Sequence, residues 1–253
     1  EDAQWTGRMF GGMPAYLINV SYPTQLVMQS VGRIKNLLDT PAAFLFFAML
    51  ALWLMLRILK IDPWLSIAPA LAYGLSTYFL LIIGAGHITK MWALVYAPAM
   101  LGSIHYTLRK NMWIGGALTA LFASLEAGAN HPQITYYFVL VAAALFISDA
   151  IFAIKNRVCK DFAQRAVVLV GAAILALGAN FAPLYYTMQH TSDTVRGGSA
   201  LAEGGERKGL DIDYATAWSY GIAESWNMLI PDFAGRDSGH SFLHDGVPPD
   251  DSL

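Results

Sequence analysis

Residues 125–137 read LEAGANHPQITYY, and they separate two long apolar runs that decide the fold of the chain. Four polar side chains of this stretch lie close to both runs: Glu126, Asn130, His131 and Gln133. Hydrocarbon penalises an unpaired polar group by several kcal/mol, and a charged one by roughly 2.5 to 3.5 kcal/mol on insertion scales. We therefore expect this stretch at a membrane surface, as the floor of an active or binding site.

The composition is that of a membrane protein. The chain has 253 residues, of which 56% are hydrophobic and only 13% are charged, whereas a soluble domain has about 25% charged residues. The net charge of −2 argues against a nucleic-acid partner, because no basic face is present to neutralise phosphates. The single cysteine, Cys159, excludes an internal disulfide.

Six apolar segments predict an all-α, polytopic integral membrane protein with about six transmembrane helices. They are residues 41–56, 64–83, 91–108, 112–125, 132–154 and 166–188. Most approach the roughly 20 residues that a helix needs to cross about 30 Å of hydrocarbon. The fourth is the shortest, so we expect it to tilt little, to pack closely on a neighbour through Gly115 and Gly116, or to lie where the membrane is thinned around Glu126.

The Lys and Arg residues of the short loops predict the orientation. Eight of them follow the first, third and fifth segments: Arg57, Lys60, Arg109, Lys110, Lys155, Arg157, Lys160 and Arg165. The loop after the second segment has only Lys90, and the loop after the fourth has none. Cytoplasmic loops are the basic ones, so both ends of the chain are expected outside. An outside N-terminus without a signal peptide predicts an earlier helix that carried it across the membrane.

The regions that flank the spans are predicted to lie on the outer side. Residues 1–40 form a first outer loop with an amphipathic interfacial helix, whose apolar stripe consists of Val27, Val31, Ile34 and Leu38. Arg33 and Lys35 lie off this stripe, and a plain packed helix in a soluble cap is the alternative interpretation. Residues 189–253 begin an acidic, aromatic-containing outer loop or domain, which holds eleven of the 18 Asp and Glu residues.

This topology gathers polar side chains from several outer loops at one depth. His87, Thr89 and Lys90 join the polar residues of 125–137, and Gln189, His190 and Asp193 follow the sixth segment. Lysine and histidine suit a phosphate group, and Glu126 suits a general base that deprotonates a hydroxyl.

Other interpretations remain open for the same side chains. Lys90 is equally explained as an anchor at a helix end, and the histidines as helix caps. His87, His131 and Glu126 together allow a divalent metal, although no tight ligand spacing such as HExxH is present.

Four blocks of sequence resemble a known family. They are WTGRMFGGMPAY (5–16), GHITKMWALVYAP (86–98), GANHPQITYY (128–137) and SYGIAESWNMLIPDFAG (219–235). In this order they are similar to the YfhO-like bacterial membrane proteins of the Bacteroidetes type, which are assigned to the glycosyltransferase C superfamily. The resemblance implies a multi-pass enzyme of the bacterial cytoplasmic membrane. That enzyme transfers a sugar from a polyprenyl-phosphate donor to an envelope glycan or lipid acceptor on the outer, periplasmic face, with inversion.

The resemblance also bears on the site. The superfamily has an acidic base in the first outer loop, so the expected base lies upstream of Glu1. Within this chain the catalytic candidates are Glu126 and His131. The matching blocks imply a substrate-lining role for four further residues: His87, Lys90, Asn130 and Gln133.

Two functions compete with a glycosyltransferase. A lipid or polysaccharide transporter or flippase predicts charges near the middle of several spans and an inverted repeat, whereas most charges here lie at the ends of the spans. A non-catalytic scaffold for envelope assembly predicts that removing Glu126 or His131 leaves function intact. No cofactor follows from the sequence, and a divalent metal stays open.

Overall fold

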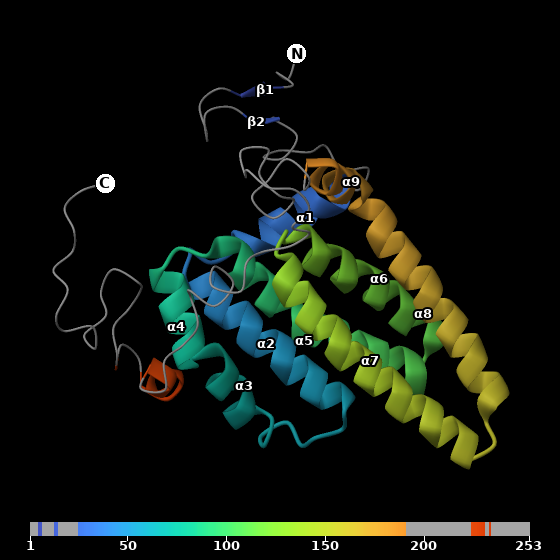
Figure 1. Ribbon diagram of the computed structural model, residues 1–253. Helices are drawn as coiled ribbons and strands as arrows, with labels where there is room; N and C mark the ends of the chain where they lie inside the picture. The colour runs from blue at the N-terminus through green and yellow to red at the C-terminus, as the bar shows by residue number, and fades with distance from the viewer. Residues whose placement is uncertain (1–4, 7–12, 15–24, 191–223, 231–232, 234–253) are drawn as a thin grey trace, which may run out of the picture. The chain divides into compact units, whose positions relative to one another are not determined.

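The described part of the chain is almost entirely helical, as the sequence predicts. The computed structural model describes residues 5–6, 13–14, 25–190, 224–230 and 233 (Figure 1). Its two short strands, β1 (Trp5–Thr6) and β2 (Met13–Pro14), pair antiparallel with Trp5 opposite Pro14. Most of the acidic outer region, at 191–223, 231–232 and 234–253, lies outside the described residues.

Helices occupy all six apolar segments. Their bounds are α1 (Gln25–Lys35), α2 (Ala42–Ile58), α3 (Ile67–Gly74), α4 (Thr77–Gly84), α5 (Ile88–Arg109), α6 (Met112–Gly128), α7 (Pro132–Lys155), α8 (Cys159–Ala179), α9 (Phe181–His190) and the 3-10 helix η3 (Glu224–Met228). The second segment is broken at Leu75 and Ser76, because Ser76 has an extended backbone. The sixth begins earlier than predicted, at Cys159, and is broken at Asn180.

Three of these segments are long and apolar enough to cross a membrane. They are Ile67–Gly84, which joins α3 and α4, and the helices α7 and α8. The helices α2 and α6 are apolar but have only 17 residues each. The structure is therefore consistent with a membrane protein, and the number of six spans stays a prediction.

The contacts between residues divide the chain into two compact units. One comprises Glu1–Ser30 and Gly178–Tyr220, and its described elements are β1, β2, the start of α1 and α9. The other comprises Val31–Leu177 and Gly221–Leu253, and it contains α2 to α7 together with most of α8.

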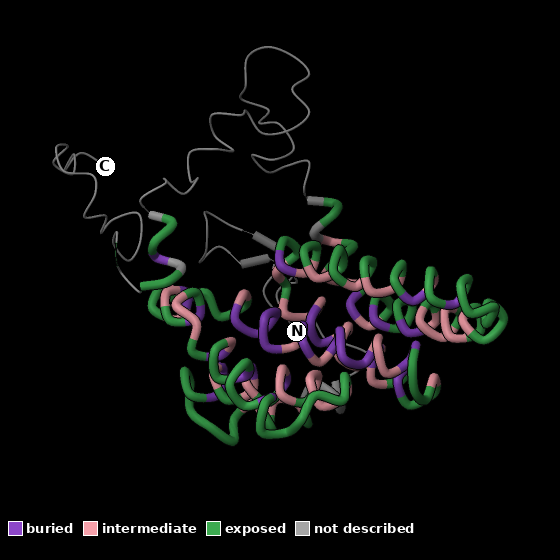
Figure 2. The backbone as a smooth tube through the Cα atoms, turned by 90° about the horizontal axis from the view of Figure 1, so that it is seen from below, coloured by how far each residue is buried: buried purple, intermediate pink, exposed green. Residues whose placement is uncertain are grey.

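Helix α5 is the centre of the larger unit, because α2, α4, α6 and α7 all pack on it. Figure 2 shows the buried residues concentrated on the inner helices and the exposed ones along the outer helices. Met91, Trp92 and Val95 of α5 meet Phe44 of α2 and Ile134 of α7 in one apolar cluster. Since α5 is covered on most sides, its sequence shows almost no amphipathic pattern.

Pro98 lies inside α5 and changes its hydrogen bonding. Proline has no N–H, so the carbonyl oxygen of Leu94, four residues earlier, loses its helical partner. The Tyr73 hydroxyl of α3 donates to this oxygen at 2.8 Å. A buried backbone carbonyl requires such a partner, so this bond both satisfies α5 and fixes α3 against it.

Glycine sets the close approach of α6 to its neighbours, as expected. A Cβ atom on Gly115 would lie 2.5 Å from the backbone nitrogen of Thr107 on α5. A Cβ on Gly116 would collide with Val168 on α8. Only glycine permits either approach without a shift of the helices.

The outer helices expose large apolar side chains. Val167, Ile174 and Leu175 on α8 are 70%, 63% and 67% exposed, and Ile147 and Ile151 on α7 are about half exposed. Apolar patches of this extent mark a membrane or protein contact. Together with the lengths of α7 and α8, they fit a lipid environment.

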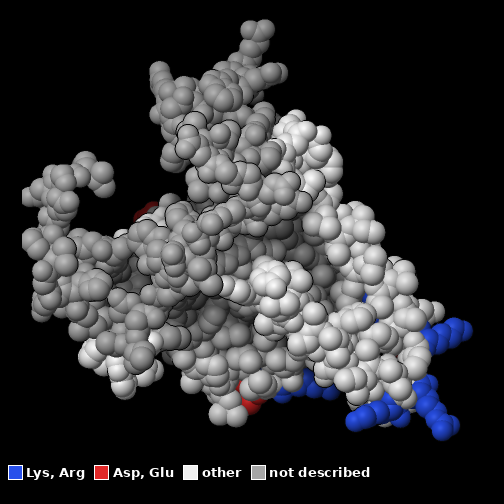
Figure 3. Space-filling model, in the orientation of Figure 1, with Lys and Arg blue, Asp and Glu red and all other residues white. Residues whose placement is uncertain are grey.

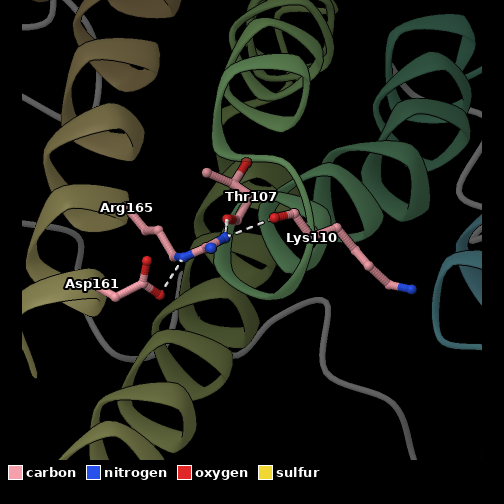
Figure 4. A network of polar contacts seen from close by, with 4 residues as sticks. All are labelled: Thr107, Lys110, Asp161 and Arg165. Carbon is pink, nitrogen blue, oxygen red and sulfur yellow. Dashed lines mark hydrogen bonds and ion pairs between the residues drawn. The ribbon is translucent and has the colours of Figure 1, made fainter. Parts of the chain in front are cut away.

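Lys and Arg side chains gather at one end of the bundle, over the α7–α8 corner (Figure 3). There Arg109 of α5 forms an ion pair with Asp149 of α7, which is 7% exposed. Arg165 of α8 pairs with Asp161 at 2.7 Å and donates to the carbonyl oxygen of Thr107 at 2.8 Å (Figure 4). It also donates to the carbonyl oxygen of Lys110 at 3.0 Å. Arg165 therefore satisfies the carbonyl end of α5 and ties α8 to it.

We predict that Tyr73→Phe lowers the stability of the purified full-length protein by about 1 to 3 kcal/mol, because it leaves the Leu94 carbonyl without a partner. In a Pro98→Ala background the loss should be smaller, since the new amide N–H supplies the missing helical bond. Unfolding in detergent, followed by circular dichroism, measures both effects. Tyr106→Phe is the control and should have little effect. Equal losses in the two backgrounds would contradict this account of α5.

Candidate functional site

The candidate site lies where α6 ends and α7 begins. Ala129 and Asn130 make the turn, and Asn130 adopts a left-handed backbone conformation with φ of 58°. His131 precedes Pro132, the first residue of α7. The first N–H groups of a helix have no partner within the helix. Proline, which lacks an N–H, is therefore favoured at this position. The sequence thus builds a tight corner that places polar side chains beside two helix ends.

Glu126 is the most unusual residue of this corner. It lies in the last turn of α6, and its side chain is only 1% exposed. Its Oε1 atom has no hydrogen-bond partner in the described part of the chain. The Thr135 side chain of α7 faces the carboxyl group within hydrogen-bonding reach. Burying a carboxylate without a cationic partner costs several kcal/mol of folding free energy. A contribution to stability therefore does not explain Glu126.

His131 lies in the electrostatic field of two residues from the start of α5. Burial lowers the pKa of the His131 imidazole below its usual range, and the charges of Lys90 and His87 lower it further. The Nδ1 atom of His131 is buried and accepts or donates no hydrogen bond among the described residues. The structure therefore brings His131, Lys90 and His87 into one neighbourhood, with a neutral imidazole favoured.

The remaining predicted residues are more exposed. His87, Asn130 and Gln133 have exposed side chains, whereas Lys90 is half-buried. Gln133 donates from Nε2 to the Tyr137 hydroxyl at 3.1 Å, one turn further along α7. It is thus engaged within its own helix rather than with the other candidates.

The predicted third loop of the cluster belongs to the smaller unit. Gln189 is an exposed residue of the smaller unit and donates to the Tyr185 hydroxyl at 2.9 Å. His190 ends α9 in the same unit. Asp193 lies outside the described residues.

The structure gives no support for a metal at this corner. Over residues 25–190 and the short stretches described beyond them, no three His, Cys, Asp or Glu side chains come together as potential ligands. His87, His131 and Glu126, which the sequence allowed as a set, therefore do not converge on one ligand position.

Two polar contacts of the larger unit were not predicted from the sequence, one at the corner and one on α5. Thr135 was hidden in an apolar run, although it lies one helical turn from His131 and donates to its carbonyl oxygen at 3.3 Å. Lys35 was placed off the apolar stripe of α1, yet its Nζ lies 3.8 Å from the centre of the Trp92 ring. Burial lowers the pKa of Lys35. A cation over an indole ring is a stabilising contact that helical periodicity alone does not reveal.

This arrangement suits proton transfer next to an anion. A buried carboxyl group without a full set of hydrogen bonds can exchange a proton with a bound hydroxyl. Lys90 supplies positive charge, and Lys90 and His87 both supply N–H donors for phosphate oxygens on the accessible side. The corner therefore combines a candidate base with a candidate anion site.

Comparisons with protein-family models, with curated proteins and with solved structures found no match to this chain.

We predict that Lys90→Gln raises the pKa of His131 toward its ordinary value of about 6.5, because it removes a nearby positive charge. Histidine-selective NMR titration of the full-length protein in detergent measures this change. Lys155→Gln, at the other end of α7, is the matched control and should leave His131 unchanged. A His131 that titrates identically with and without Lys90 would contradict the described neighbourhood.

The same shift has a consequence for stability. The fold favours neutral His131. The contribution of this imidazole to the free energy of unfolding is therefore fully present above the unfolded pKa of about 6.5. It is lost as the pH falls through that value toward the lower folded pKa. We expect His131→Asn to flatten the dependence of stability on pH between about 7 and 5, as measured by thermal unfolding. An unaltered pH profile would contradict a neutral, half-buried imidazole.

Proposed function

We propose that this chain is part of a membrane glycosyltransferase of the C type, related to the YfhO-like proteins. It moves a sugar from a polyprenyl-phosphate donor to a glycan or lipid acceptor of the cell envelope. The proposal includes about six membrane spans in the bacterial cytoplasmic membrane. The four sequence blocks that resemble the family support it, and the geometry of the α6–α7 corner supplies the chemistry.

The observation that carries the proposal is the buried, incompletely hydrogen-bonded carboxyl group of Glu126. A structural acid at a helix end is normally paired or solvated, and Glu126 is neither. A buried carboxyl group of this kind, with one oxygen lacking a hydrogen bond, is a functional-site candidate. A transporter predicts charges near the middle of several spans, whereas Arg109 ends α5 and Asp149 lies within the last two turns of α7.

The orientation in the proposal follows from the two polar ends of the bundle. The end with Arg109, Lys155 and Arg165 faces the cytoplasm, where basic loops are retained. The α6–α7 corner and the start of α5 then face the outside. Both ends of the chain also lie outside, where lipid-linked sugars and envelope acceptors meet.

The proposed reaction is an inverting displacement at the anomeric carbon. The acceptor hydroxyl loses its proton to a carboxylate as its oxygen forms a bond to this carbon. Meanwhile the bond from carbon to the phosphate oxygen breaks, and the electron pair leaves with polyprenyl phosphate. Glu126 is the acid of the described residues best suited to take the proton. Lys90 offsets the charge that grows on the leaving phosphate, and the imidazoles of His87 and His131 offer N–H donors to its oxygens.

We predict that Glu126→Gln lowers release of polyprenyl phosphate by about 10² to 10⁴-fold, the usual contribution of a general base. The variant should keep or gain thermal stability, because it removes a buried acid. The assay follows full-length protein in liposomes with a panel of radiolabelled polyprenyl-phosphate sugars. His131→Ala is assayed alongside and should also lower release.

Asp161→Asn is the matched control, since it makes the same change to an exposed acid at the other end of the bundle. It should leave release unchanged. Release by the parent protein that persists in Glu126→Gln would remove Glu126 from the reaction. No release with any donor, while lipid still binds, would contradict the transferase and favour a transporter or a scaffold.

A further inference from the structure

A groove runs along α5 between α2 and α6. Both helices pack on α5, and two hollows lie between them, of about 290 Å³ and about 480 Å³. Leu54, Ala99 and Phe122 line both hollows. The two are therefore neighbouring sections of one groove, whose floor is α5.

The groove is apolar along its length and basic at its ends. Lys35 lies at one end, over Trp92, while Arg57 and Lys110 line the other. Trp92 and Tyr106 of the floor are 14 positions apart, which corresponds to about 21 Å of helix. That is about two thirds of the hydrocarbon thickness of a bilayer.

The end with Arg57 and Lys110 is the more complete site for an anion. No acidic side chain lines this hollow. Arg57 uses Nη1 to bond the carbonyl oxygen of Ile61, which fixes the guanidinium but leaves its other N–H groups. Figure 4 shows the Lys110 side chain extending away from Arg165. Arg165 contacts Lys110 through the backbone carbonyl oxygen, not through the ammonium group.

The two cations and the apolar wall together define the occupant. A soluble anion would match Arg57 and Lys110 but not the side chains of Leu54, Leu118 and Phe122 beside them. A purely apolar molecule would leave the cations without a partner. Basic pockets between membrane helices are a recognised form of site for anionic lipid head groups.

We propose that this groove binds an anionic phospholipid, with the head-group phosphate on Arg57 and Lys110 and an acyl chain along α5 between α2 and α6. The inference rests on the membrane location in the proposed function, and it is independent of sugar transfer. The lipid fills the space between α2 and α6, both of which pack on α5.

The test measures lipid binding to the full-length protein by native mass spectrometry. Phosphatidylglycerol is compared with phosphatidylcholine of identical acyl chains, without any sugar donor. Each cation contributes about fivefold near a membrane surface, so we expect a preference of about 30-fold for the anionic lipid. Arg57→Gln and Lys110→Gln should each remove about fivefold, and the double variant should abolish the preference.

The double variant Lys155→Gln/Lys160→Gln is the matched control. It removes two exposed cations from the same basic end, but neither lines the groove. It should keep the preference for phosphatidylglycerol. Equal binding of both lipids by the parent protein, or an equal loss in the control, would overturn the proposal because the attraction would then be general.

A second variant tests whether the acyl chain lies along α5 between α2 and α6. Ala99→Phe should fill the section where the two hollows meet and weaken the binding of both lipids, with size-exclusion and thermal unfolding as checks of the fold. Unchanged lipid binding by folded Ala99→Phe would overturn the groove as the binding place. Because no sugar donor is present, a failed transferase assay leaves this result unaffected, and the reverse also holds.

Discussion

The hydrogen bond from Tyr73 to the carbonyl oxygen of Leu94 allows a proline to stand inside the most buried helix of the chain. An unpaired carbonyl at that depth would cost as much as a lost hydrogen bond. With it satisfied, α5 serves as the surface on which α2, α4, α6 and α7 pack. The ends of α5 then carry polar candidates: His87 precedes its first turn, Lys90 lies in that turn, and Arg109 is its last residue.

Much of the fold follows from the sequence because long apolar runs in a chain of this composition have few alternatives to helix. Every predicted segment is helical, and the glycines of α6 make the close approaches expected of them. The break at Ser76, the one at Asn180 and the early start at Cys159 were not predicted. These are set by local backbone conformation and packing, which leave little trace in hydrophobicity.

The candidate site was predictable in its members but not in its contacts. The short stretch around Glu126 and His131 was conspicuous, since polar residues beside apolar runs require a partner or a role. Which side chains meet depends on the packing of α5 against α7, and this decides that Lys90 acts on His131 while Gln133 bonds within its own helix. Long-range partners of this kind are not encoded in spacing along one helix.

The account requires the α6–α7 corner and the basic end of the bundle to lie on opposite sides of a membrane. Labelling of cysteines with a membrane-impermeant maleimide in intact cells tests this directly. The native Cys159 is exposed at the basic end and should react only after the membrane is permeabilised. In a Cys159→Ser background, Asn130→Cys should react in intact cells. Reaction of both from the same side, or of Cys159 alone from outside, would contradict the account.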